Sequence, residues 1–123
     1  MNVYVASKSH HGALWRQYRE SWRDVGVNVI STWIDESGPG QTSDVSDLWL
    51  RCIAEASACD FLVALHVEGE QWKGAYIEIG AALASGKPVF VVGHHLGSWM
   101  NHPLVTVVSD PDDAVDYFLR GAA

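Results

Sequence analysis

The chain has 123 residues, of which 48% are hydrophobic and 19% are charged, and its formal net charge is −7. These values are typical of a single globular domain, residues 1–123, with one core. The acidic balance excludes a binder of nucleic acid polymers, because such proteins hold phosphates with clustered lysines and arginines. No apolar run approaches the ~20 residues of a membrane helix, so we expect no membrane partner.

The amino-terminal segment and the cysteines point to a cytoplasmic chain. Residues 1–5 have no basic start and no long apolar stretch, so we expect no secretory signal. Cys52 and Cys59 are too few and too far apart for a structural zinc site. We expect both to be reduced, buried and apolar in role.

Short apolar runs alternate with helical patterns along the chain. The first run, 3–6, predicts a strand, and the spacing over 13–25 predicts a helix that ends near Gly26. Further strands are predicted at 27–31, 61–65, 89–92 and 105–108, and further helices at 44–57, at 74–85 and after the capping residue Asp110.

One predicted helix and one predicted loop stand out. The helix at 44–57 has the clearest apolar face, formed by Val45, Leu48, Trp49, Cys52, Ile53 and Ala56. The loop before it, 34–43, is long and rich in Gly, Pro, Ser and Asp. Loops of this kind are usually functional or mobile.

Strands that alternate with helices predict an α/β fold. We expect one doubly wound, flavodoxin- or Rossmann-like sheet of five mostly parallel strands, in the order 2-1-3-4-5, with flanking helices. Ligands of such sheets bind at the carboxyl ends of the strands, near the switch in strand order. The candidate site is therefore formed by the loops that follow Ala6, Ser31, Leu65 and Val92.

Glu78 is the candidate for chemistry. It is the only charged side chain of the predicted helix at 74–85, and its neighbours are small or apolar. A carboxylate in such surroundings is costly unless it is paired or has a task. From its position alone, Glu78 could equally be a helix residue that faces solvent.

A family resemblance bears on this choice. The segment 78–89, Glu-Ile-Gly-Ala-Ala-Leu-Ala-Ser-Gly-Lys-Pro-Val, resembles the signature of the nucleoside 2-deoxyribosyltransferase superfamily, and so does 59–64 ahead of it. The likeness spans about 3–92, and the amino-acid sequence of the segment 78–89 is similar to that of short phage and prophage members. It implies that Glu78 is a nucleophile that attacks the anomeric carbon of a nucleoside or nucleotide and displaces the base. Hydrolysis or transfer to another base then completes the reaction.

The resemblance also implies a substrate pocket. The loop after the first strand would contribute Ala6, Ser7 and Lys8, and a 5′-phosphate could bind there with backbone N–H groups of 9–12. Asp47 or Asp44 would hold the sugar hydroxyls. Trp33 and Trp72 could stack on the base, although core or interface packing is the role that we favour for each.

Relatives are assembled as dimers or larger oligomers with shared pockets. The resemblance places the segment 93–103 at such an interface, where Ser98, Asn101 and His102 could reach a neighbour's pocket. The six tryptophans, more than a small core readily hides, agree with a homodimer or higher homo-oligomer.

The chain departs from the family upstream of Glu78. Transferases often have an aspartate about six residues before the nucleophile, where this chain has Gln71, Trp72 and Lys73. Glu68, Glu70 or His66 could replace it. The departure shifts the expectation from base exchange towards hydrolysis, or towards binding without turnover.

We expect no cofactor and no metal. The histidines of 93–103 lack paired acids at ligand spacing, and the first loop matches neither a flavin phosphate loop nor the acid cluster of a receiver domain. Three functions stay open: a glycosidase or transferase on nucleosides or nucleotides, a glycohydrolase that cleaves NAD with the same glutamate, and a non-catalytic nucleotide-binding module.

Overall fold

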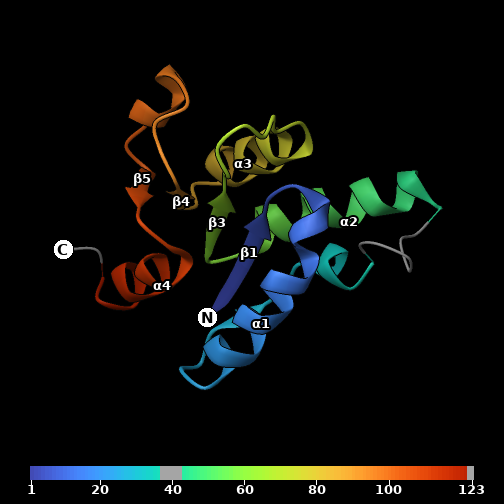
Figure 1. Cartoon of the computed structure of the whole chain (residues 1–123), viewed down its shortest axis with the longest axis horizontal. Helices are drawn as coiled ribbons and strands as arrows, with labels where there is room; N and C mark the ends of the chain where they lie inside the picture. The colour runs from blue at the N-terminus through green and yellow to red at the C-terminus, as the bar shows by residue number, and fades with distance from the viewer. Residues whose placement is uncertain (37–42, 122–123) are drawn as a thin grey trace.

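A computed structural model describes residues 1–36 and 43–121 and contains one five-stranded sheet (Figure 1). Every neighbouring pair of strands is parallel, and the order β2-β1-β3-β4-β5 is the predicted one. The strands are β1 (Asn2–Ala6), β2 (Asn28–Val29), β3 (Phe61–Leu65), β4 (Val89–Val92) and β5 (Val105–Val108). The predicted doubly wound α/β fold is confirmed.

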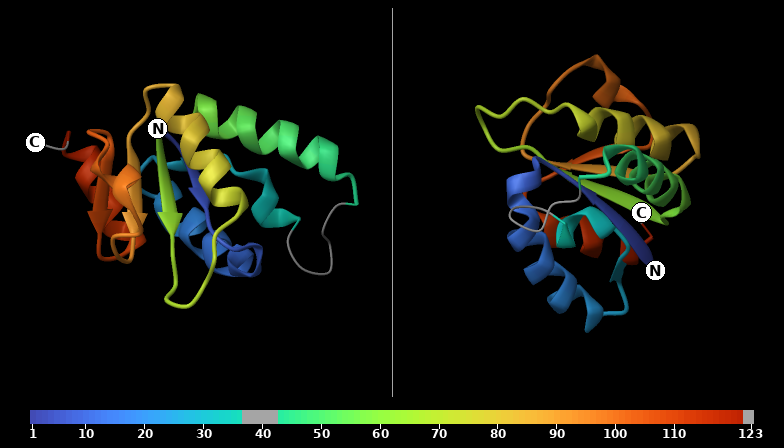
Figure 2. Two further views of the ribbon diagram at one scale, coloured as in Figure 1. Left: turned by 90° about the horizontal axis from the view of Figure 1, so that it is seen from above. Right: turned by 90° about the vertical axis from the view of Figure 1, so that its right-hand side faces the viewer.

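Helices cover both faces of the sheet (Figure 2). The helices α1 (Gly12–Arg23) and α4 (Pro111–Leu119) lie on one face, and α2 (Val45–Ala58) and α3 (Gly74–Ala84) lie on the other. Right-handed crossovers place α1 on the face opposite α2 and α3, because the chain moves along the sheet in opposite directions before and after β2. Three short 3₁₀ helices complete the described part: η1 (Ser9–His11), η2 (Thr32–Asp35) and η4 (Ser98–Asn101).

The helix starts follow from local side-chain chemistry. The carboxylate of Asp44 accepts a hydrogen bond from the backbone N–H of Asp47 and caps α2. Asp110 caps α4 in the same way through Asp113, and Pro111 occupies the first turn, where no N–H is needed. Among the described residues no helix is long and apolar enough to cross a membrane.

The central strands form the core. The side chains of Val3, Tyr4, Val5 and Ala6 are fully buried, and so are those of the first four residues of β3. A strand that is covered on both faces has no solvent side, which explains its continuous apolar run. Both cysteines are free thiols and buried, as predicted.

The second strand is shorter than the predicted 27–31. Its ladder begins with Asn28 N–H bonded to the Met1 carbonyl (2.8 Å) and continues with Ile30 N–H bonded to Val3 (2.9 Å). The next acceptor is a side chain: the Val5 N–H donates to Oγ of Ser31 at 2.7 Å. The main chain is thereby released to turn into η2, while the buried N–H keeps a partner.

The apolar face predicted for α2 is only partly buried. Cys52 and Ala56 are in the core, but the exposed fractions of Val45 (56%) and Ile53 (40%) are large. The helix packs against α3 and η2, which cover one side of its apolar stripe. The predicted loop 34–43 starts within η2, and its residues 37–42 lie outside the described residues.

Candidate functional site

A pocket of about 220 Å³ opens at the carboxyl ends of β1 and β3, where the fold predicts a ligand site. Its walls come from the loop after β1, from η2, from α2 and from the start of α3. Those lining residues are Ser7, Lys8, Ser9, Trp33, Leu48, Trp49, Cys52, Trp72, Lys73, Gly74, Ala75 and Glu78.

Glu78 lines this pocket from the buried side of α3. Only 7% of the residue is exposed, so it is not the solvent-facing helix residue that its position alone allowed. Its small neighbours Ala75 and Ala82 are buried with it. The hydroxyl of Tyr4, on β1, donates a hydrogen bond to Oε2 of Glu78. The carboxyl group is thus held between the central sheet and the pocket.

Burial controls the protonation of this pair. Desolvation raises the pKa of Glu78 to about 7, the hydrogen bond from Tyr4 opposes the rise, and the charge of Glu55 adds to it. Desolvation, followed by the charge of Glu78, also raises the pKa of the Tyr4 hydroxyl far above its ordinary value. Tyr4 therefore stays a neutral donor, while Glu78 exchanges its proton near neutral pH.

Two indole rings in the walls are fixed by the ends of the strands. The indole N–H of Trp33 donates to the Val5 carbonyl at 2.9 Å, and that of Trp72 donates to the Leu65 carbonyl at 3.1 Å. Both tryptophans are buried and line the pocket. Both rings are thus packed in the core and also present surface to the pocket, whereas their stacking on a base stays a prediction.

A third tryptophan, Trp49, lies where α2 meets α3. A Cβ atom added to Gly74 would come within 2.7 Å of its indole ring, so only glycine leaves room for this contact. Trp49 is half-buried and lines the pocket. The first residue of α3 thus sets the distance between the two helices at the pocket.

Two lysines bring positive charge to the pocket of an acidic chain. Lys8 and Lys73 both line it, and neither forms an ion pair with another described residue. The Ser7 hydroxyl, which also lines the pocket, is engaged, since its Oγ accepts from Trp15 Nε1 at 2.8 Å and donates to the Lys8 carbonyl at 2.9 Å. An anion in this part of the pocket would meet ammonium groups that are not already neutralised.

Six candidate substrate-binding residues lie outside the lining of this pocket, among them Asp44, which caps α2, and the exposed Ser98. Ala6 is buried at the end of β1. Asp47 is exposed and bound to Arg51 at 2.8 Å. Asn101 and His102 are exposed at the end of η4. Their roles stay predictions.

No substitute acid reaches the pocket lining from the segment before α3. The Glu70 carboxylate contacts His10 and His11. The backbone carbonyl oxygen of Glu70 lies 2.8 Å from His66 Nε2. Glu68 is exposed and does not line the pocket. Among the described lining residues Glu78 is the only carboxylic acid.

Tyr4 is the main site residue that the sequence did not reveal. It lies in a short apolar strand, where a tyrosine reads as ordinary core. Its hydroxyl could have indicated the contact, because a buried phenol needs a hydrogen-bond partner. Glu78, on a neighbouring element, was the carboxylate without a known partner. Lys73 also lines the pocket, although the sequence marks it only as a departure from the family.

No protein-family model and no curated protein sequence matches the chain. Solved structures do match. The CMP N-glycosidase BcmB of Clostridium botulinum has a TM-score of 0.60 at 13% identity, over 96% of this chain and 98% of that one. The 2-deoxyribosyltransferase of the psychrotolerant bacterium Bacillus psychrosaccharolyticus has a TM-score of 0.69 at 18% identity, over 95% and 92%.

The chain has the fold of the nucleoside 2-deoxyribosyltransferases. The resemblance of the segments 59–64 and 78–89 is thereby confirmed at the level of the fold. The match covers nearly the whole of both chains.

The buried carboxyl of Glu78 predicts an unusual pH dependence of stability. Above pH 4.5 the unfolded chain releases this proton, whereas the folded chain keeps it until about pH 7. The raised pKa of Glu78 therefore adds to the unfolding free energy of the parent below the pKa of the unfolded chain. This contribution is lost as pH rises through the pKa of the folded chain. We expect Glu78→Gln to gain up to about 3 kcal/mol in unfolding free energy relative to the parent between about pH 4 and pH 8.

Urea unfolding of the parent and the variant across this pH range measures the difference. The exposed Glu68→Gln is the matched control, and its unfolding free energy should follow that of the parent. Curves for Glu78→Gln and the parent that stay parallel throughout would contradict the burial of a neutral carboxyl.

Proposed function

We propose that the chain cleaves the N-glycosidic bond of a nucleoside or nucleoside 5′-monophosphate, with Glu78 as the nucleophile. The observation that carries the proposal is one buried carboxyl group, bound by Tyr4, that lines the pocket at the switch in strand order. The two solved structures of similar fold are, by their names, a CMP N-glycosidase and a 2-deoxyribosyltransferase.

The chemistry uses both oxygens of Glu78. Tyr4 binds Oε2, and Oε1 has no hydrogen-bond donor among the described residues, so it is the attacking atom. As the bond between the anomeric carbon and the base breaks, its electron pair goes to the base nitrogen and an ester forms with Oε1. The developing positive charge on the sugar is stabilised by the carboxylate, which is itself largely buried.

Water completes the reaction in the proposed main path. It attacks the anomeric carbon, the ester C–O bond breaks, and the carboxylate is regenerated with retention at the sugar. The attacking water releases one proton to solvent, which balances the proton that the departing base takes up from solvent, since no second carboxylic acid is present among the described lining residues. This favours hydrolysis, because base exchange needs an acid that serves the leaving and the entering base in turn.

The remaining walls fit the parts of such a substrate. Trp33, Trp72 and Trp49 provide aromatic surface for a base, and Lys8 and Lys73 provide charge for a 5′-phosphate. Ala6 and Ser7 would shape the loop below the phosphate. Asp47 would bind the sugar only after its ion pair with Arg51 opens.

A panel of substrates tests the activity. We expect the parent to release free base from at least one member of a set of ribo- and deoxynucleosides and their 5′-monophosphates, measured by chromatography. Glu78→Gln should lose about 10³-fold or more in kcat, since the nucleophile is removed. The parent's kcat/KM should fall below about pH 7, where Glu78 is protonated.

Glu68→Gln serves as the control and should keep the parent's rate. A parent rate for Glu78→Gln would contradict the nucleophile. NAD is tested beside the panel, and release of its base with none from the panel would support the NAD-cleaving alternative. Binding of a panel member by calorimetry without any release would support the non-catalytic module.

The two pocket lysines predict a preference for phosphorylated substrates. We expect Lys8→Ala and Lys73→Ala each to raise KM for a 5′-monophosphate about tenfold, because each variant loses one charge-assisted hydrogen bond. The KM for the nucleoside should stay unchanged. Steady-state kinetics on both substrates measure this. Lys87→Ala, next to the amino end of β4, is the control. Equal effects on nucleoside and monophosphate would contradict the phosphate contact.

We also propose that the chain forms a homodimer or a larger homo-oligomer. The outer side of α2 exposes an apolar hollow lined by Trp49, Leu50 and Ile53, and 70% of Leu50 is exposed. Large apolar side chains gathered on one surface commonly mark an interface. In such an assembly Asn101 and His102 could reach a neighbour's pocket.

Light scattering at micromolar concentration tests the assembly. The parent should have the mass of a dimer or more, and Leu50→Glu should shift it to a monomer because a charge enters the apolar contact. Leu119→Glu, on α4 at the other face of the sheet, is the matched control. A monomeric parent would contradict the proposal.

A further inference from the structure

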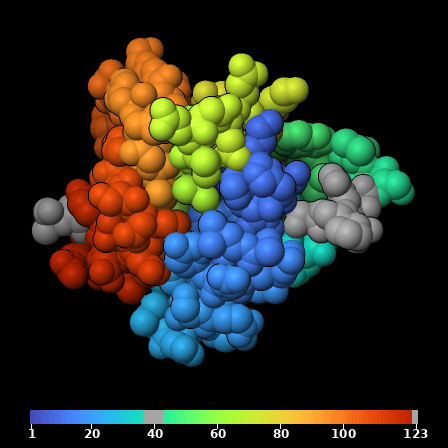
Figure 3. All heavy atoms as spheres, in the orientation of Figure 1, coloured from blue at the N-terminus to red at the C-terminus, as the bar shows by residue number. Residues whose placement is uncertain are grey.

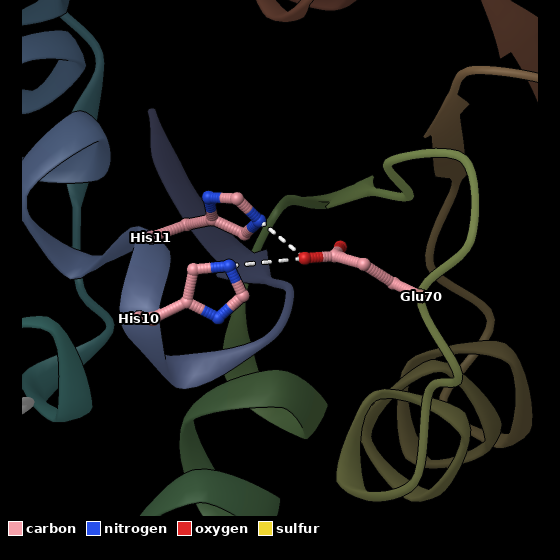
Figure 4. Close-up of side chains that lie close together, drawn as sticks. All are labelled: His10, His11 and Glu70. Carbon is pink, nitrogen blue, oxygen red and sulfur yellow. Dashed lines mark hydrogen bonds and ion pairs between the residues drawn. The ribbon is translucent and has the colours of Figure 1, made fainter.

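Beside the pocket, two neighbouring histidines meet a glutamate from a distant part of the chain. The segment after β3, in yellow-green, lies against the blue segment after β1 (Figure 3). Nε2 of His10 lies 3.1 Å, and Nε2 of His11 lies 2.8 Å, from the same carboxylate oxygen, Oε2 of Glu70 (Figure 4). The three potential ligand atoms all lie within 4.8 Å of one another.

These separations fit one bound cation. Ligand atoms at the usual zinc distances in a tetrahedral arrangement are about 3.3 Å apart. The two N–O distances, 3.1 and 2.8 Å, are slightly shorter, so a small outward movement of the side chains would admit an ion between them. The His10 side chain is 66% exposed, which leaves one side of the cluster open to water ligands.

The backbone holds the ligands in place before any ion binds. Glu70 ends a tight turn in which its N–H donates to the Val67 carbonyl (3.0 Å) and Gly69 has a φ of +88°. The Val67 N–H donates to the other carboxylate oxygen, Oε1, at 3.3 Å. The histidines lie on η1, where the N–H of His11 is bound to the Lys8 carbonyl at 3.1 Å. Such support outside the ligands is typical of metal sites.

A purely ionic contact accounts less well for the convergence. The hydrogen bond between His11 and Glu70 (2.8 Å) gives that carboxylate oxygen a partner, but it does not account for the second imidazole nitrogen, which His10 brings to the same oxygen at 3.1 Å with the two rings 4.0 Å apart. A metal ion binds both histidines in their neutral form and supplies the charge that the carboxylate requires.

We propose that His10, His11 and Glu70 bind a divalent first-row transition ion of the Zn²⁺ type, which ties together the two loops that flank the pocket. Two imidazoles and one carboxylate suit such ions better than Mg²⁺ or Ca²⁺, which prefer oxygen ligands. Ser7 to Ser9 directly precede the histidines, and Trp72 to Gly74 follow shortly after Glu70. The bound ion therefore fixes two walls of the pocket without touching Glu78. This site is independent of the proposed glycosidase function.

Zinc binding to the full chain tests the proposal. After removal of metals with a chelator, calorimetry with Zn²⁺ should show one saturable site per chain, and Co²⁺ should give visible absorption bands at the same stoichiometry. Hydrogen exchange should slow in 7–12 and 66–73 when Zn²⁺ is present. His11→Ala and Glu70→Gln should weaken Zn²⁺ binding at least about tenfold, because loss of even an outer partner has that effect.

His95→Ala is the matched control, since His95 is an exposed histidine on another loop, and it should bind Zn²⁺ as the parent does. If a variant fails to fold by circular dichroism, Zn²⁺-induced shifts of the His10 and His11 imidazole NMR signals in the parent decide instead. Absence of a saturable site, parent-like affinity in Glu70→Gln, equal loss in His95→Ala, or unshifted imidazole signals would each overturn the proposal.

Discussion

The hydrogen bond between Tyr4 and Glu78 joins the first strand to the third major helix inside the protein. A carboxyl group with 7% exposure is stable there only if it has a partner or keeps its proton; this one has Tyr4 as its partner and keeps its proton up to about pH 7. The small residues of α3 bring the helix close enough to the sheet for the contact. The pocket exists where this pair reaches the carboxyl ends of the strands.

The fold was readable from the sequence because its signals are local. The apolar runs at 61–65 and 89–92 became strands with the predicted bounds, and Asp110 with Pro111 begins a helix as its chemistry requires. The second strand was overestimated because Ser31 replaces a backbone acceptor with its hydroxyl. A sequence pattern shows that a serine is polar, but it does not show which distant N–H the serine will meet.

The apolar face of α2 shows a different limit. Helical spacing shows that Val45, Cys52 and Ile53 share one stripe, yet only neighbouring elements decide how much of the stripe is covered. Here α3 and η2 cover Cys52 and leave Val45 and Ile53 exposed. The candidate site behaves likewise: the isolation of Glu78 was visible, whereas Tyr4 and the pairing of Glu70 with two histidines depend on contacts across more than fifty residues.

The hydrogen bonds of Trp33 to Val5 and of Trp72 to Leu65 limit how this pocket could change in evolution. Their indole N–H groups satisfy carbonyls near the ends of adjacent strands, so replacement by phenylalanine would keep an aromatic face but leave a buried carbonyl without its donor. Substitutions at Trp33 and Trp72 are therefore disfavoured, because the carbonyl groups of the sheet need these indole donors. Leu48 and Lys73, which have no such bond, are the positions at which new substrate preferences could be acquired without loss of the scaffold.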